Sequence, residues 1–424
     1  MSTTTITKRQ RSYTLFLLVI VFTSSHVDRQ IVAILQEPIK AAFQISDTQL
    51  GLLTGVMFAL FYATLGMPMA MWADRRNRRN LIAFSITLWS AMTALCGAAV
   101  QFWQLLLARI GVGVGEAGSN PPSHSIISDL YAPEERATAM AIFGLGVNLG
   151  VMLGYLIGGW VNEWLGWRLA FVVAGVPGLI IALMVRYTMQ EPPRGYAEGV
   201  VDRPPAPPFG QVVKHMWQNS TIRHLLSANV LISFAGYAGI AWAPVYFQRV
   251  HGMSTGESGT VLALAIGLGG GIGTFLGGYL ADRWAKTNEG WRAWVVVAAA
   301  LIYLPMAVMC FLAADTTTAL LWYFGPAALG GAYIGTNFAI LQSQLPLQMR
   351  SVGAAINLFI LNIIGLGLGP LSVGIISDMY EPSVGIDSVR YGLLFTVLIM
   401  AWGAAHQWRV GSLLSRAASS TPSR

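Results

Sequence analysis

The chain has 424 residues, of which 54% are hydrophobic and only 11% are charged, and its formal net charge is +7. A soluble protein of this length would carry about 25% charged residues, so the composition excludes an ordinary soluble fold. It indicates an all-α membrane protein, because lipid offers no partners for the unpaired backbone groups of irregular segments.

Apolar stretches of about 20 residues, long enough to cross a bilayer, recur along the chain. They predict twelve transmembrane helices in two pseudo-symmetric six-helix domains, at 1–190 and 223–424. The predicted spans are 12–35, 48–72, 80–99, 103–127, 137–161, 167–188, 223–248, 255–280, 293–313, 318–343, 351–377 and 390–410. Residues 8–25 look like a signal peptide, but the apolar run continues without a small-residue cleavage site, so we expect the first span there.

The segment between the two domains, 191–222, is predicted to be a cytoplasmic linker. It contains Glu191-Pro-Pro and the run Pro204-Pro-Ala-Pro-Pro208. Pro-rich composition suits a semi-rigid tether between domains. A short amphipathic piece at 209–219 is a candidate for a helix that lies on the membrane surface.

The basic residues predict the topology. With both termini in the cytoplasm, about twenty of the 26 Lys and Arg residues face inward, as expected for a membrane protein. The net charge is then explained by helix ends that lie beside anionic lipid, and a nucleic-acid partner is not expected. Cys96 and Cys310 both fall within spans, far apart in sequence, so we expect neither a metal site nor a disulfide framework.

Two sequence signatures occur twice, about 208 to 214 residues apart. Each Asp-Arg pair closes an apolar stretch, and each later Arg precedes an Asn by twelve residues. Tandem membrane units predict a secondary transporter with its binding site between the halves. An Asp at a helix C-terminus needs a partner, because it faces the negative end of the helix dipole. The residues predicted to act in gating are Asp74, Arg75, Arg78, Arg136, Asp282, Arg283 and Arg350; alternatively, these charges only anchor helix ends at the headgroups.

Glycines in the fifth span recur at intervals of four, at Gly146, Gly150, Gly154 and Gly158. This spacing gives one smooth helix face that allows close packing against a partner helix. We expect the seam to lie at the interface between the domains, where the halves rock during transport.

Four charged residues lie inside predicted spans of the first half: Asp28, Arg29, Arg109 and Glu116. A charge in mid-membrane costs at least about 2.5–3.5 kcal/mol on insertion scales, so each needs a role or a partner. We expect Arg29 and Arg109 to bind an anionic group, with Glu116 in the same site, and Asp28 and Glu116 to couple transport to protons. The alternative is an ion-pair network that only braces the first half. His26 and His124 are expected to be polar helix residues rather than proton carriers.

The corresponding spans of the second half contain no charge away from their ends. Glycine stands at position 330, opposite Glu116, and the side chains expected at the cavity are aromatic or amide. A cavity with one charged and one apolar wall suits an amphipathic substrate. The substrate-binding residues predicted here are Tyr237, Trp242, Asn337, Phe338, Asn357 and Asn362, with Tyr246, Tyr333, Gln342 and Phe359 as further cavity residues.

Several motifs resemble the spinster-type branch of the major facilitator superfamily. They are Asp28-Arg29, the loop from Asp74 to Arg78, the run from Arg109 to Gly118, the segment Ser128 to Arg136 and Gly166-Trp167-Arg168. The resemblance covers the whole chain but is specific mainly in the first half, and Ala70, Asn77 and Ala285 replace glycines of the family's loop signature. It implies export of lysophospholipids or sphingosine-phosphate-like lipids, with protonation linked to alternating access. Carried over by position, Arg29 and Arg109 match headgroup contacts, while Asp28 and Glu116 match buried acids.

The leading hypothesis is therefore a proton-coupled transporter of an anionic or zwitterionic amphiphile. The alternative is a proton symporter of small organic anions, such as sugar acids or sugar phosphates. An enzyme is not expected, because neither a metal-ligand spacing nor a Ser-centred nucleophile motif occurs. We expect no cofactor, a monomer, and residence in a bacterial plasma (inner) membrane.

Overall fold

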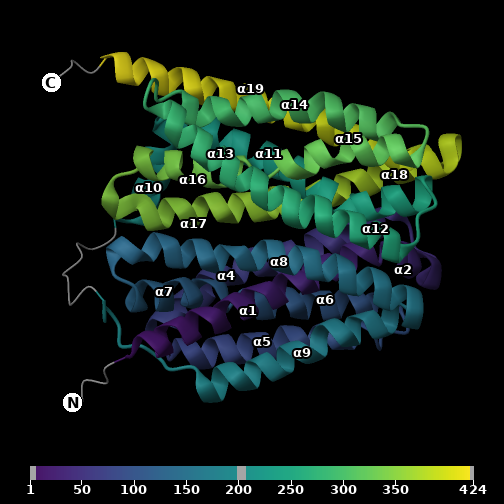
Figure 1. Ribbon diagram of the computed structural model, residues 1–424, viewed down its shortest axis with the longest axis horizontal. Coiled ribbons are helices and arrows are strands. Elements are labelled where there is room, and N and C mark those ends of the chain that lie inside the picture. Colours follow the sequence, from purple (N-terminus) through teal and green to yellow (C-terminus); the bar gives the residue numbers. More distant parts are fainter. Residues whose placement is uncertain (1–5, 198–206, 421–424) are drawn as a thin grey trace. The chain divides into compact units, whose positions relative to one another are not determined.

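The computed structural model describes residues 6–197 and 207–420, and every regular element in these ranges is helical. The chain divides into two compact units (Figure 1). Unit 1 contains Met1–Ile45, Met57–Arg203 and Ser254–Ala263. Unit 2 contains Ser46–Val56, Pro204–Met253 and Leu264–Arg424. Each unit thus takes up a short piece of a span that belongs to the other half of the sequence. The predicted domain boundaries remain a prediction.

The helices of unit 1 follow the predicted spans closely. Long helices run alongside one another, with α1 against α8 and α5 against α9. The elements are α1 (Lys8–Ile34), α2 (Gln36–Phe43), α4 (Met57–Arg75), α5 (Arg78–Cys96), α6 (Phe102–Glu116), α7 (Asn120–Leu130), α8 (Pro133–Leu165), α9 (Trp167–Thr188) and α12 (Thr255–Leu262).

Unit 2 repeats this plan, with α11 against η5 and α18 and with α14 against α19. Its elements are α3 (Asp47–Gly51), η1 (Leu52–Val56), α10 (Phe209–Gln218), α11 (Ser220–Val245), η2 (Tyr246–Val250), α13 (Gly270–Ala285), α14 (Trp291–Leu312), α15 (Thr316–Leu329), α16 (Tyr333–Gln344), η4 (Leu347–Met349), α17 (Arg350–Ile360), η5 (Leu361–Leu368), α18 (Gly369–Val384), η6 (Gly385–Asp387) and α19 (Ser388–Ser420). The π-helical η3 (Ala263–Gly269) crosses from one unit to the other.

Two predicted spans are broken helices rather than continuous ones. The fourth span consists of α6 and α7, separated at 117–119, and the tenth consists of α15 and α16, separated at 330–332. Pro121 and Pro122 lie in the first turn of α7, where a missing N–H costs least. The sequence pattern showed only a continuous apolar run, so the breaks were not predicted.

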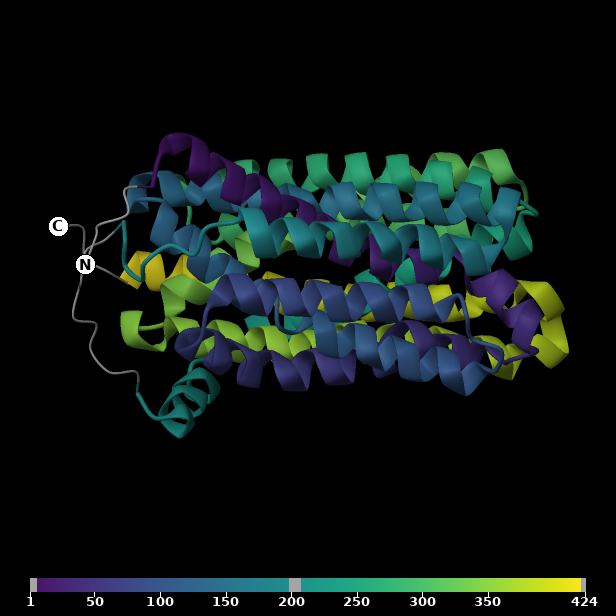
Figure 2. The same cartoon turned by 90° about the horizontal axis from the view of Figure 1, so that it is seen from below.

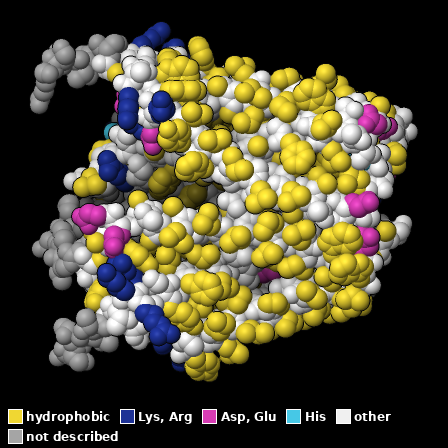
Figure 3. Space-filling view, in the orientation of Figure 1, with side chains coloured by type: hydrophobic (Ala, Val, Ile, Leu, Met, Phe, Trp, Pro, Cys, Tyr) yellow, Lys and Arg dark blue, Asp and Glu magenta, His cyan; other side chains and the backbone are white. Residues whose placement is uncertain are grey.

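The exposed apolar surface indicates that these helices lie in lipid. Large hydrophobic side chains such as Phe275, Leu321 and Leu398 are about 70% exposed. On the face shown in Figure 3, hydrophobic side chains cover most of the surface, and Lys and Arg side chains gather near the left edge. Exposed apolar surface on this scale marks contact with lipid. Eight described segments are long and apolar enough to be spans, and the 72-residue segment Leu347–Ala418 contains more than one crossing. The molecule is a multi-pass membrane protein.

The glycines of α8 from Gly146 to Gly158 pack against α1, whereas the adjacent Gly159 lies against Thr255 of α12, in the eighth span. An added Cβ atom on Gly154 would lie 2.7 Å from Gln30 Cβ and 3.0 Å from the Val27 carbonyl oxygen. The Cβ of Gly146 would lie 3.0 Å from the Val19 carbonyl oxygen. The seam therefore holds α1, the helix that carries Asp28 and Arg29, at a fixed distance from α8.

Gly154→Leu is expected to lower the free energy of unfolding by about 1–3 kcal/mol or more, because the side chain would overpack the contact with α1. Gly144→Leu on the same helix is the matched control, since no atom lies within 4 Å of its added Cβ. Thermal unfolding of the two purified variants in detergent measures the difference. Equal melting temperatures would contradict the packing role of the seam.

Candidate functional site

The break of the fourth span places Glu116 at the last position of α6. A carboxylate is unfavourable at a helix C-terminus, because the last carbonyl groups already carry negative partial charge. The side chain is 1% exposed, so water cannot screen it. Glu116 therefore needs a cation close by.

Arg29 of α1 is this cation. Its Nη2 and Nε atoms donate to Glu116 Oε2 at 2.6 and 2.8 Å. The Arg29 side chain is 16% exposed, whereas Glu116 Oε1 is buried without a hydrogen bond. The pair thus joins α1 to the break of the fourth span, and Arg29 is its more accessible member.

Asp28 and Arg109 lie deeper in the same unit. Arg109 Nη1 donates to the backbone oxygen of Asp28 at 3.2 Å, and the Arg109 side chain is buried. The Asp28 carboxyl group is fully buried and lies near Thr93, but neither oxygen has a hydrogen bond of normal geometry. The structure therefore brings the four predicted residues together. The Glu116 carboxylate pairs with the Arg29 side chain, whereas the Asp28 carboxyl group has no such pair among the described residues.

An aromatic stack supports both guanidinium groups, and the sequence analysis missed it. Phe58 and Tyr62 of α4 stack with ring centroids 5.4 Å apart. The Arg29 guanidinium carbon lies 4.8 Å from the Phe58 centroid and 4.7 Å from that of Tyr62, and Arg109 lies 5.4 Å from Phe58. Cation–π contacts of this kind favour the charged guanidinium in an apolar setting. An i, i+4 aromatic pair in an apolar span looks the same in sequence as a lipid-facing pair.

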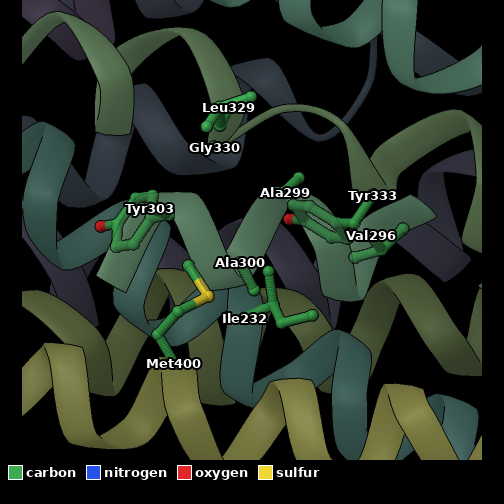
Figure 4. A pocket seen from close by; sticks show the side chains of 9 residues that line it. All are labelled: Ile232, Val296, Ala299, Ala300, Tyr303, Leu329, Gly330, Tyr333 and Met400. Atoms are coloured by element: carbon green, nitrogen blue, oxygen red, sulfur yellow. The ribbon is translucent and has the colours of Figure 1, made fainter. Parts of the chain in front are cut away.

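The equivalent position in unit 2 carries a cavity instead of charges. Gly330 follows α15 as Glu116 ends α6. The cavity is small, about 20 Å³ as measured with a water-sized probe, which is room for about one water molecule (Figure 4). Its lining is apolar except for two tyrosines: Ile232, Val296, Ala299, Ala300, Tyr303, Leu329, Gly330, Tyr333 and Met400. The charged site of unit 1 thus lies at the break of the fourth span, and the apolar cavity of unit 2 lies at the break of the tenth span, its equivalent under the repeat.

Two predicted binding residues of unit 2 belong to a buried amide network. Asn337 Nδ2 donates to Asn229 Oδ1 at 2.7 Å, and Asn229 Nδ2 donates to Asn357 Oδ1 at 3.0 Å. Gln407 Nε2 donates to Asn337 Oδ1 at 2.6 Å. All four side chains are buried, so this network joins α11, α16, α17 and α19. Its hydrogen bonds give Asn337 and Asn357 a structural role.

The other predicted residues of unit 2 differ in exposure. Trp242 is fully buried and donates from Nε1 to the Pro370 backbone oxygen at 2.8 Å, and the buried Tyr246 hydroxyl donates to the Cys310 oxygen at 2.5 Å. Phe338 is 46% exposed. The half-buried or exposed members, which remain candidates for substrate contact, are Tyr237, Tyr333, Phe338, Gln342, Phe359 and Asn362.

The two predicted polar histidines pack within unit 1. His26 Nδ1 is 3.0 Å from the Phe22 oxygen, and its ring meets that of Phe22 edge-on. The His124 ring meets that of Phe143 edge-on at 5.2 Å. Both imidazole rings thus pack against phenylalanine rings.

Five of the seven predicted gating residues have a described partner within their own unit. Arg78 is 1% exposed and contacts Asp129, Glu191 Oε1 at 2.7 Å and the Pro192 oxygen at 2.8 Å. The Asp74 side chain lies outside the described residues. The remaining contacts are Arg136 to the Ser128 oxygen, Asp282 to Arg292, Arg283 to the Tyr279 hydroxyl and Arg350 to the Leu345 oxygen, with Arg75 exposed.

A pair of carboxylate caps, Glu163 and Asp378, was also missed. Glu163 Oε2 of α8 accepts from Ser254 Oγ and Gly256 N at 2.8 and 2.9 Å, at the start of α12. Asp378 of α18 accepts from the backbone N–H groups of Asp47 and Thr48, both at 2.8 Å, at the start of α3. Carboxylates at helix N-termini satisfy free N–H groups and favour the helix dipole. The two caps are equivalent under the repeat.

A second buried ion pair stands beside the cap of α3. Arg249 Nη1 and Nη2 donate to the two oxygens of Asp47 at 2.6 and 2.8 Å. Ser377 Oγ donates to Asp47 Oδ2 at 2.5 Å. Asp47 is fully buried and the Arg249 side chain is 9% exposed. This bidentate pair belongs to unit 2 and joins the start of α3 to η2.

The chain has broken spans, an internal repeat and a charged group inside its spans. These features are typical of a secondary transporter. Residues 15–370 match the family model of the Major Facilitator Superfamily. The chain belongs to this superfamily, and the all-α architecture of twelve spans in two six-helix domains is confirmed.

Individual relatives extend this result. The chain is 32% identical over 396 residues to an MFS-type efflux pump of Mycolicibacterium smegmatis, covering 92% of this chain and 90% of the pump. It is 24% identical to protein spinster homolog 1 of Xenopus laevis, over 88% and 76% of the two chains. A probable L-galactonate transporter of Escherichia coli is 25% identical over 66% of this chain and 63% of its own.

The solved structures agree. A bacterial homologue of the human lysosomal transporter spinster superposes with a TM-score of 0.87 at 30% identity, covering 97% of this chain and 98% of that one. The predicted resemblance to the spinster-type branch is therefore confirmed at the level of sequence and fold.

Proposed function

We propose that this protein is a proton-coupled secondary transporter that moves an anionic or zwitterionic amphiphile, of the lysophospholipid or sphingosine-phosphate class, by alternating access. The observation that carries the proposal is the contrast between related breaks of the two units. Arg29 and Glu116 form an ion pair at one, and at the other the side chains around Gly330 are apolar or tyrosine. A molecule with an ionic head and a hydrocarbon chain matches both surfaces.

Arg29 is the proposed direct contact for the anionic head, because it is the most exposed of the four charged residues. Arg109 is buried behind it and supports the site through the Asp28 backbone and the Phe58 ring. The proposed gate comprises the two Asp-Arg loops, with Arg78, and the second repeated pair, Arg136 and Arg350. The efflux activity named for the mycobacterial relative favours export.

Asp28 and Glu116 are the proposed proton-coupling residues. The Asp28 carboxyl group has no hydrogen bond of normal geometry to a described residue in its buried site, which favours proton exchange there, and intramembrane acids such as Asp28 and Glu116 mark proton pathways. The basic ends of the helices favour cytoplasmic termini, and the bacterial spinster homologue favours a bacterial inner membrane. A monomer contains the whole proposed site.

Asp28→Asn is expected to abolish the pH dependence of transport while substrate binding changes less than tenfold, because the amide keeps the shape of the carboxyl group but cannot exchange a proton. Flux of a fluorescent lysophospholipid into proteoliposomes, measured with and without a pH gradient, tests this. Glu116→Gln is the companion variant. A normal pH response in both variants would contradict the proposed coupling.

The second candidate is proton symport of small organic anions, which the similarity to the probable L-galactonate transporter favours. Sugar acids would bind the same arginines but leave the apolar cavity of unit 2 unused. Thermal-shift measurements with lysophospholipids and sugar acids separate the two candidates. Stabilisation by sugar acids alone would overturn the proposal in favour of the second candidate.

A further inference from the structure

Helix α10 has an apolar face that unit 2 leaves uncovered. Val212 and Met216 are buried against Ile222, Leu225 and Leu345. Phe209, Val213 and Trp217 follow at intervals of four, and they are 58%, 41% and 72% exposed. Four residues advance about 40° around a helix, so these three side chains form one stripe beside the buried one.

The position of α10 places this stripe at the level where a membrane span begins. The helix ends at Gln218, and α11 begins at Ser220 with Asn219 as its N-cap. Figure 2 shows α10, the short teal helix, lying across the direction of the long helices. A helix next to a span and transverse to it lies along the membrane surface rather than through it.

The charged residues of α10 and of the first turn of α11 are all basic. Lys214 and Arg223 are exposed, and the described segment 207–248 contains no Asp or Glu. Lys214 follows the apolar stripe on the helix surface, and Arg223 lies in the first turn of α11. Basic residues beside a Trp-containing apolar face match an anionic lipid surface.

We propose that α10 is an anionic-lipid binding element, in which Phe209, Val213 and Trp217 insert at the boundary of headgroups and acyl chains while Lys214 and Arg223 bind lipid phosphates. The buried stripe of α10 packs in one cluster with Leu341 and Leu345, at the end of the broken tenth span, and against Val352 and Ile356 of α17. Lipid binding at α10 therefore stabilises the ends of these helices. This inference does not rest on the proposed substrate.

Spin labelling of the full-length protein in liposomes tests the insertion. Cys96 and Cys310 are buried, so a nitroxide can be directed to Val213→Cys, with Gln218→Cys on the polar face as the matched control. In vesicles of phosphatidylcholine mixed equally with phosphatidylglycerol, the label at 213 should collide more with oxygen and less with a water-soluble nickel chelate than the label at 218. Equal accessibility at the two positions would overturn the insertion.

The headgroup contact has its own test. Lys214→Glu combined with Arg223→Glu should lower partitioning of the 213 label into the mixed vesicles, by about fivefold for each basic charge lost or more. Lys286→Glu, an exposed change near the end of α13, is the control and should leave the label unaffected. Insertion that is the same in phosphatidylcholine alone and insensitive to the reversals would overturn the anionic-lipid site. Transport is not measured, so failure here is distinct from failure of the proposed function.

Discussion

Arg29→Ala is expected to weaken binding of an anionic lysophospholipid by about 30-fold or more, because the buried anionic head would lose its charged, hydrogen-bonded partner, at a cost of about 2–5 kcal/mol or more. The variant also leaves Glu116 buried without its cation, which lowers the stability of the protein. Thermal-shift titration or microscale binding with the purified protein measures the effect.

Two controls separate substrate contact from stability. Arg11→Ala removes the exposed pair with Glu135, whose side chains are 26% and 53% exposed, and should leave affinity unchanged. Arg29→Gln combined with Glu116→Gln removes both charges, so it should recover stability but not binding. Wild-type affinity in either Arg29 variant would contradict a role in binding the head group.

Asp47→Ala is expected to lower the free energy of unfolding by about 3–5 kcal/mol, because it leaves the Arg249 guanidinium buried without its carboxylate. Both oxygens of Asp47 accept from Arg249, and Ser377 donates to one of them. The melting temperature in detergent and the yield of monodisperse protein are the measurements.

A matched surface pair provides the comparison. Asp387→Ala breaks the pair with Arg390, in which the carboxylate is 49% exposed, and should cost less than about 1 kcal/mol. Asp47→Leu combined with Arg249→Met replaces the buried pair by apolar side chains and should recover much of the loss. Equal melting temperatures for Asp47→Ala and Asp387→Ala would contradict the stabilising role of the buried pair.

The sequence predicted the spans well because each span depends on a local property, the length of an apolar run. It also predicted that Asp28, Arg29, Arg109 and Glu116 lie together, since charges inside apolar helices need partners. It did not predict that Glu116 ends a helix. That feature depends on the new helix, α7, that begins with Pro121 and Pro122 in its first turn.

The sequence pattern does not show which distant segments contact one another. Asp47 lies just before the predicted second span, and nothing in the pattern relates it to its partner Arg249, 202 positions later. Phe58 and Tyr62 could not be distinguished from aromatic residues that face lipid. Asn337 and Asn357 were expected at the substrate, because a single sequence does not show that amides bind one another.

The π-helical turns have a consequence for movement. The chain passes between the units at 56/57 and 263/264, at the end of η1 (Leu52–Val56) and the start of η3 (Ala263–Gly269). Wide turns of this kind are weak points of a helix, with one residue more per hydrogen-bonded ring. If one unit shifts against the other, the second and eighth spans must flex at these turns. The carboxylate caps hold the short helices α3 and α12, which precede these turns. The second and eighth spans would therefore bend at the π-helical turns rather than tilt as rigid helices.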